Sequence, residues 1–492
     1  MRWRLSAAVL AGACLVVCVA TARADRERGL PPPPVHRLSI VARENRRPGT
    51  TGWLGPTATG SAIEVYAGST DAAPGETVGV HVSTVPAARY RLLVYRLGWY
   101  RGVGAREVLC LPTCSGDEQG VPQAMPAPDG DGRIAAGWPV TDTATVARWV
   151  SGYYLFRAVL TSGAQAGASA STYVIVNRPG NRSGMLVQVP VNTWQAYNSW
   201  GGRSLYDLPT LGPRARRVSF DRPYAWYGPG GQGPLGWELP LLRFIERRGW
   251  DVSYQSDVVT DARPATLLRH RLVVVAGHSE YWSRTMRDAF EVARDHGVNL
   301  AFMGANAAYY QVHMEDGGRT VMSYKSLSDP NPDALSKTAM FRELTPPRYE
   351  CGLIGIQHQG VGLHWQPGDY SVVASSLGDP WMRNTGFTAS TKLPGIVSIE
   401  TDTIPGNQTA ASSCGHALTV FFHRELGGDK DGDADATRYT APSSATVFAS
   451  GSHQFAWGLD DFALDPDEGH GHVSRPLQRF VRNAFNSMIR PS

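Results

Sequence analysis

The sequence predicts an antiparallel β-sandwich followed by a parallel α/β domain whose C-terminal part is again rich in strands. Two observations support this fold class. Residues 60–178 contain short apolar and aromatic runs separated by turn residues, whereas after residue 181 fully apolar runs alternate with segments of helical periodicity. The chain has 492 residues, of which 42% are hydrophobic, and this is enough for about two or three cores of ordinary size. Such a composition excludes a disordered, collagen-like or coiled-coil protein.

The sandwich is predicted from the spacing of its strands. Glycine and proline residues separate the runs and favour an antiparallel arrangement of about seven strands. The domain, placed at residues 56–180, has the size of an immunoglobulin-like module. Strands are expected at 63–66, 77–82, 90–95, 152–160 and 172–176.

The second domain, placed at residues 181–492, is predicted from a change of period. Strands that alternate with helices imply a parallel sheet. Strands are expected at 185–191, 251–254, 271–276 and 298–303, and helices at 237–248, 285–296 and 476–488. A β-rich C-terminal part is expected from apolar runs at 371–374, 395–399, 417–422 and 445–449.

The first 24 residues have the pattern of a secretory signal peptide. Arg2 and Arg4 precede an apolar stretch, and small residues allow cleavage near Ala22 or Ala24. The stretch is short for a membrane span and no later one reaches about 18 apolar residues, so we predict a secreted protein without a span. Residues 25–55, with their run of prolines, are predicted to be an extended linker.

The net charge limits the classes of binding partner, and the cysteine content indicates the redox compartment. The formal net charge of +4 falls to about +1 once the signal peptide is removed, which argues against a nucleic-acid partner. Four cysteines remain, and an even number in an oxidising compartment favours two disulfides. Proximity in sequence favours Cys110 with Cys114 and Cys351 with Cys414 among the three pairings, and zinc at the first pair is the alternative.

Polar loops follow three of the predicted parallel strands, at the sheet edge where ligands bind in open α/β sheets. The loops are NTWQAYNSWGGRSLYD (192–207), GHSEYW (277–282) and GANA (304–307). The second places an imidazole, a hydroxyl, a carboxylate and a phenol on consecutive residues, which indicates a functional site. In the structural alternative, Ser279 caps the helix, Glu280 complements its dipole and His278 makes a structural hydrogen bond.

These motifs resemble the large (beta) subunit family of N,N-dimethylformamidase and its secreted relatives. The resemblance extends over nearly the whole mature chain. It implies a glutamine-amidotransferase-like, flavodoxin-like α/β domain in which two tyrosines and one glutamate hold a mononuclear ferric ion, Fe(3+). The matching segments are YRLGWY (95–100), WVSGYY (149–154), AYNSWGGRSLYD (196–207), FDRPY (220–224), GHSEYW (277–282), GANA (304–307) and WGLDDF (457–462).

The resemblance implies Tyr197, Tyr206 and Glu280 as the metal ligands, with Tyr224 and Tyr227 as alternatives for the second tyrosine. The ligand set suits ferric iron, because a hard cation prefers oxygen donors and three anionic ligands neutralise its charge. Such an ion acts as a Lewis acid toward a substrate carbonyl or water.

The resemblance implies that His278 matches the histidine beside the metal and that Asn306 matches the asparagine of the next strand-end loop in this family. We expect His278 to carry protons and Asn306 to hydrogen-bond a developing oxyanion, so that these two residues and Glu280 form the catalytic set. The predicted function is hydrolysis of a carbon–nitrogen amide bond in a small molecule. The sequence leaves the substrate and the oligomeric state open.

The sequence bears on three alternative functions. A cysteine nucleophile of the glutamine-amidotransferase type has no candidate in residues 277–282, and a serine hydrolase based on Ser279 lacks the small residue required where Tyr281 stands. A different class is a secreted binding protein, with an inactive α/β scaffold and a sandwich that binds glycan or protein.

The alternating carboxylates of residues 429–435 depart from EF-hand spacing, which favours a solvated turn over a calcium loop.

Overall fold

The computed structural model describes residues 38–207, 213–225, 234–361, 368–397, 400–406, 414–425, 433–462 and 472–490. The predicted signal peptide, Tyr227 and most of the acidic run 429–435 lie outside the described residues. The fold is mixed α/β with several sheets and few helices, as the sequence predicts at that level. The domain boundaries at residues 56 and 181 stay a prediction.

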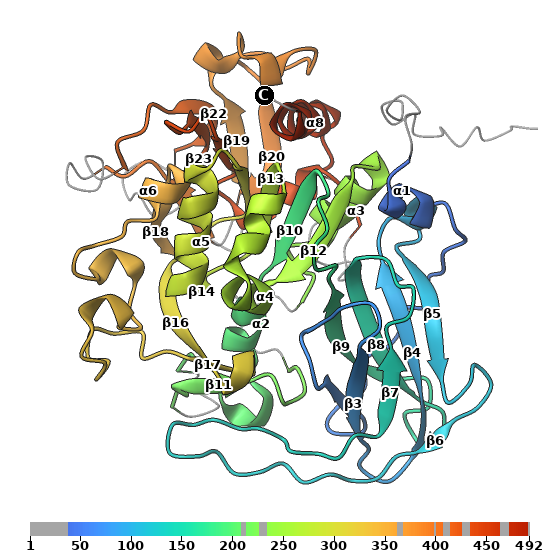
Figure 1. Ribbon diagram of the computed structural model, residues 1–492. Coiled ribbons are helices and arrows are strands. Elements are labelled where there is room, and N and C mark those ends of the chain that lie inside the picture. The colour runs from blue at the N-terminus through green and yellow to red at the C-terminus, as the bar shows by residue number, and fades with distance from the viewer. Residues whose placement is uncertain are drawn as a thin grey trace, which may run out of the picture. The chain divides into compact units, whose positions relative to one another are not determined.

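Two sheets form the N-terminal part (Figure 1), and apolar side chains from both contribute to one core. All pairs are antiparallel except β2 with β9. The first sheet contains β1 (Glu64–Ala67), β3 (Thr77–Ser83) and β7 (Asp142–Thr145). The second contains β2 (Asp71–Ala72), β9 (Ser169–Val176), β8 (Gly152–Leu160), β4 (Arg89–Leu97), β5 (Ala105–Leu111) and β6 (Glu118–Gln119). All five predicted strands are present, and the periodicity missed the short β2, β6 and β7 and the partly exposed β5.

A nine-stranded sheet is the centre of the second part (Figure 1). Its first five strands are parallel, which confirms the parallel sheet, and the other four continue it in antiparallel pairing. The β-rich C-terminal region therefore extends the same sheet. In spatial order the strands are β12 (Val252–Ser256), β10 (Met185–Val189), β13 (Leu272–Ala276), β15 (Asn299–Met303), β24 (Thr446–Ala449), β23 (Ala434–Thr440), β22 (Thr419–Arg424), β19 (Gly368–Val372) and β20 (Lys392–Val397).

Helices cover both faces of this sheet. Alternate residues of β13 belong to two different cores, because successive side chains of a strand point to opposite faces. Side chains of α3 and α8 pack in one core and those of α5 in the other. The α-helices are α1 (Ile40–Glu44), α2 (Val191–Tyr197), α3 (Leu239–Arg248), α4 (Asp257–Ala262), α5 (Arg284–Asp295), α6 (Cys351–Ile354) and α8 (Arg475–Ile489).

Short elements fill the loops beyond the strand ends. The strands are β11 (Arg217–Ser219), β14 (Tyr281–Ser283), β16 (Tyr310–Glu315), β17 (Thr320–Met322), β18 (Gln357–Val361) and β21 (Glu400–Thr403). The 3₁₀ helices are Tyr100–Gly102, Trp200–Gly202, Pro264–Arg269, Asp316–Gly318, Ala334–Ser336, Phe341–Glu343, Ala374–Ser376, Pro380–Met382 and His453–Gly458.

The predicted linker is folded where the structure describes it. Helix α1 begins after Ser39, whose hydroxyl accepts from the backbone N–H of Ala42, and Val41 and Trp53 are buried in the core of the α/β part. The expectation of an extended linker is therefore wrong for this stretch, because its few apolar residues are too widely spaced to show a period but still pack.

Both disulfides pair as proximity in sequence predicts, Cys110 with Cys114 and Cys351 with Cys414. The pairing leaves the first two cysteines without the thiolates that zinc requires.

Asp435, at the end of the acidic run, is buried in β23 and accepts from the hydroxyl of Thr403 at 2.6 Å. This carboxylate is structural.

A buried ion pair joins the two parts. The guanidinium of Arg96 in β4 lies 2.7 and 2.9 Å from the two carboxylate oxygens of Glu246 in α3, and neither side chain is exposed. Asn45 and Tyr254 also donate to Glu246, at 2.7 and 3.0 Å. This fully desolvated charge pair is thus one of the contacts that anchor the sandwich to the α/β part.

A long segment of the sandwich, residues 120–141, contacts the loops of the α/β part. Its Ala136 donates to the carbonyl of Asp221 at 2.6 Å, and Arg216 donates to the carbonyl of Asp131 at 2.7 Å. The ring of Trp138 meets Trp200 edge-on at 5.8 Å. This segment, named the brace here, therefore supports the stretch that carries Tyr206.

Candidate metal centre

The sequence-predicted ligands come together beyond the ends of the parallel strands. Tyr197 ends α2, which follows β10, and Glu280 lies between β13 and β14. The hydroxyl groups of Tyr197 and Tyr206 both donate to Oε2 of Glu280, at 3.0 and 2.9 Å. The rings of the two tyrosines lie 4.3 Å apart between centroids. Two phenols and one carboxylate thus converge on one point.

Backbone contacts between the strand-end loops fix this arrangement. The hydroxyl of Thr193 in α2 accepts from the N–H of Glu280 at 2.9 Å, so α2 holds the carboxylate-bearing loop directly. Gly304 lies so close to Gly277 that a Cβ at residue 304 would meet the carbonyl oxygen of Gly277 at 2.0 Å. A glycine is required there because the loops after β13 and β15 touch through their backbones.

Burial determines the protonation of the two phenols. Desolvation first, and then the negative charge of Glu280, raise the pKa values of Tyr197 and Tyr206 well above 10. Both phenols are therefore neutral in the absence of a cation. A cation beside Glu280 would favour their ionised form.

A second group of side chains adjoins the first. His278 Nε2 lies 3.4 Å from Glu280 Oε2 and 3.0 Å from Glu400 Oε2, and His453 Nε2 lies 3.6 Å from the same Glu400 oxygen. Asn306 Nδ2 donates to that oxygen at 2.8 Å. His278, Glu400 and His453 are buried and close enough together to hold a metal ion.

Burial and the neighbouring charges together determine the pKa values of this second group, and for His278 and Glu400 they act in opposite directions. Burial lowers the pKa of His278, but Glu400 and Glu280 outweigh it and raise the pKa to about 10. Burial raises the pKa of Glu400, but His278 and the other histidines hold it well below its usual range. Burial and the charge of His278 lower the pKa of His453 to about 3. The result is a buried His278–Glu400 ion pair beside a neutral imidazole.

Three buried polar atoms at this site have no hydrogen-bond partner among the described residues. They are Oδ1 of Asn306, Nδ1 of His453 and Nε2 of His278, which meets Glu400 and Glu280 as ion-pair contacts without the geometry of a hydrogen bond. Buried polar atoms are rarely left unsatisfied, so atoms of this kind indicate room for a water, a substrate group or an ion.

The remaining sequence candidates lie elsewhere. Tyr224 packs edge-on against Tyr173 of the sandwich, with centroids 6.2 Å apart, and Tyr227 is outside the described residues. Ser279 accepts from the indole N–H of Trp282 at 2.8 Å. The suggestion that Ser279 caps the following helix is wrong, because β14 intervenes and Ser283 caps α5.

Sequence reasoning missed Glu400, His453 and Lys325. Glu400 begins β21 and His453 follows β24, both far along the chain in a region interpreted only as strands. Lys325 follows β17 and donates to the hydroxyl of Tyr281 at 2.9 Å. Glu400 directly follows the apolar run 395–399, a signal that many surface strands also show, whereas neither His453 nor Lys325 directly follows such a run.

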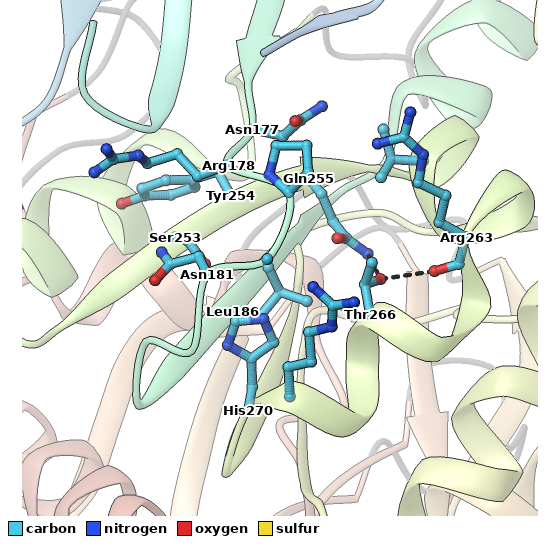
Figure 2. Close-up of a pocket in the computed structure, with 14 residues that line it drawn as sticks. Asn177, Arg178, Asn181, Leu186, Ser253, Tyr254, Gln255, Arg263, Thr266 and His270 are labelled. Atoms are coloured by element: carbon cyan, nitrogen blue, oxygen red, sulfur yellow. Dashed lines mark hydrogen bonds between the residues drawn. The ribbon is translucent and has the colours of Figure 1, made fainter. Parts of the chain in front are cut away.

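A separate, small cavity of about 20 Å³ lies between the sandwich and the α/β part (Figure 2). The predicted site residues do not line it. It is lined by Asn177, Arg178, Pro179, Gly180, Asn181, Leu186, Ser253, Tyr254, Gln255, Val259, Arg263, Thr266, Arg269 and His270.

Within the described residues, no helix has the length and apolar character needed to cross a membrane.

Comparison with known proteins places the chain in a family. Residues 91–471 match the family described as "N,N-dimethylformamidase beta subunit-like, C-terminal". No curated protein matches the chain. Among solved structures, one titled "mmIFT52 N-terminal domain" aligns with a TM-score of 0.27 and 9% identity, covering 50% of this chain and 87% of that one. A likeness this low supports no statement about fold or function.

Proposed function

Because the chain belongs to the N,N-dimethylformamidase beta subunit-like family, we propose that it is a secreted, iron-dependent hydrolase of a carbon–nitrogen amide bond in a small molecule. The observation that supports this most directly is the convergence of the Tyr197 and Tyr206 hydroxyls on Glu280 at 3.0 and 2.9 Å. The small net charge of the chain argues against a nucleic-acid partner.

The donor set fits ferric iron. All three groups offer oxygen, which a hard cation prefers, and the two buried phenols, neutral while no cation is bound, would ionise beside one. Tyr197, Tyr206 and Glu280 would hold the ion, and together they would balance its triple charge. Bound Fe(3+) supplies Lewis acidity, which polarises an amide carbonyl and acidifies water.

The surrounding side chains supply the proton chemistry. Burial lowers the pKa of His278, but Glu400 and Glu280, at 3.0 and 3.4 Å from its Nε2, raise it to about 10, so the imidazole holds a proton between the two carboxylates. We assign His278 the transfer of this proton to the leaving nitrogen of the amide. Asn306 uses one amide N–H to hold Glu400, and its second N–H is assigned to the developing oxyanion.

The finer description of the fold and location belongs to the same proposal. We assign residues 56–180 to an immunoglobulin-like sandwich and residues 181–492 to a glutamine-amidotransferase-like domain. Export with cleavage near Ala22 or Ala24 is supported by the two disulfides, which persist in oxidising compartments.

Metal analysis with a visible absorption spectrum tests the proposal. Wild-type protein should contain about one iron per chain, because three anionic oxygen donors match one ferric ion, and it should show the charge-transfer colour of iron-bound tyrosinate. Tyr197→Phe and Tyr206→Phe should lose the colour. Tyr224→Phe is the matched control, because it removes the same atom from the alternative tyrosine, and it should keep the colour.

Two outcomes would contradict the proposal. A metal-free, colourless wild type would favour a binding protein with an inactive scaffold. A colourless metal that survives both tyrosine substitutions but is lost in His453→Gln would place the ion on His278, Glu400 and His453 instead.

A further inference from the structure

One charged side chain makes the surroundings of the two tyrosines unequal. The ammonium nitrogen of Lys325 lies 3.6 Å from the ring centroid of Tyr206 and 4.5 Å from that of Tyr310. It also donates to the hydroxyl of Tyr281 at 2.9 Å. Within the part of the chain that the structure describes, no carboxylate forms an ion pair with it.

The hydrogen bonds around Lys325 have a fixed direction. An ammonium group can only donate, so the oxygen of Tyr281 must accept from Lys325. The Tyr281 hydroxyl then donates to the Tyr206 oxygen at 2.6 Å, and the Tyr206 hydroxyl donates to Glu280 at 2.9 Å. The chain of donors runs in one direction from Lys325 to the carboxylate.

Tyr197 has different surroundings. Its hydroxyl donates to Glu280, and its ring lies 5.5 Å from that of His278 and 4.3 Å from that of Tyr206. The structure shows no lysine ammonium over the Tyr197 ring among the described residues. The two phenol oxygens therefore differ in the donors and the charge around them.

The position of Lys325 is unusual for a lysine. Its backbone has a φ of +51°, in the left-handed region that most residues avoid. The chain has only four lysines, at 325, 337, 392 and 430, against an otherwise arginine-based cationic composition. An ammonium is a compact point charge that fits among rings, whereas a planar guanidinium is larger.

We propose that Lys325, acting through Tyr281 and through its position over the ring, is a positioning residue that orients Tyr206 and makes it the weaker electron donor of the two tyrosine ligands. This inference rests on the proposed iron site. A nearby positive charge stabilises negative charge on the phenolate ring and oxygen, so electrons leave Tyr206 less readily than they leave Tyr197.

The charge-transfer band measures this difference without any substrate. Removing the positive charge raises the energy of the Tyr206 electrons, so the band of Lys325→Met should move to longer wavelength. Tyr281→Phe should move it in the same direction, because the hydrogen bond to Tyr206 is lost. Lys325→Arg keeps the charge and should stay closer to the wild-type band than Lys325→Met. Lys392→Met is the matched control, because Lys392 is exposed at the start of β20, and its band should not move.

Iron content and the thermal midpoint are measured for each variant. A coloured wild type whose band is unchanged in Lys325→Met with full iron would overturn this inference alone, whereas a colourless wild type would overturn the proposed function and the inference with it. Loss of iron in Lys325→Met but not in Lys325→Arg, with the fold intact, supports the role of the charge. Loss of iron in both variants would indicate a merely structural lysine and overturn the inference.

Discussion

Replacing Arg96 with methionine tests how the sandwich is anchored to the α/β part. The substitution keeps an unbranched side chain but removes two charge-assisted hydrogen bonds to Glu246, at 2.7 and 2.9 Å. Glu246 then stays buried with only the donors Asn45 and Tyr254. Breaking a buried ion pair on one side costs about 3–5 kcal/mol. Because two neutral donors remain on the carboxylate, we expect the lower end, about 3 kcal/mol.

Urea unfolding followed by circular dichroism and tryptophan fluorescence gives the free energy of unfolding. The double variant Arg96→Met with Glu246→Leu should lose less than Arg96→Met alone, because no uncompensated charge remains. Arg89→Met is the matched control, because its partner Asp117 lies at the surface, and it should leave the midpoint almost unchanged. A loss under about 1 kcal/mol for Arg96→Met, or a larger loss in the double variant, would refute this account.

Two further predictions concern stability. Burial raises the pKa of Asp71 to about 6, so around pH 5 the folded state binds more protons than the unfolded state. The free energy of unfolding should therefore fall as pH rises from about 4 to 6, by no more than about 3 kcal/mol. Urea unfolding at each pH should show a flatter decline for Asp71→Asn, and an equal decline in both proteins would contradict the assignment. Replacing Cys351 and Cys414 by serine opens a loop with a sequence separation of 63 and should lower the free energy of unfolding by about 4 kcal/mol. The same change at Cys110 and Cys114, with a separation of 4, should lower it by about 2 kcal/mol. Equal shifts of the unfolding midpoint would contradict the loop-entropy account.

The sequence was most informative where local pattern and topology agree. The strand 185–191, the strand 271–276 and the helix 476–488 lie within one or two residues of β10, β13 and α8, because a fully apolar run or a helical stripe reflects burial directly. The same patterns place Tyr197 and Glu280 at neighbouring strand ends. Their meeting at one point follows from the parallel order of β10 and β13.

The rest depends on contacts between distant segments. Glu400 reaches His278 only because β21 and the 3₁₀ helix at His453–Gly458 return to the same edge, and a single sequence carries no periodic signal of that return. Lys325 sits at a backbone position with a φ of +51° where glycine or asparagine would be expected, so turn chemistry gave no warning. The helix in the predicted linker is also too short to show a period.

The brace has a practical consequence for protein engineering. A fragment beginning at residue 181 would keep Tyr197 and Glu280 but lose the hydrogen bonds and the Trp138 contact that hold the loop of Tyr206 from outside. Mutational libraries directed at the proposed metal site should therefore include residues 120–141 of the sandwich. Substitutions there would act on the stretch that carries Tyr206 from outside it, and variants limited to the α/β part would not test this support.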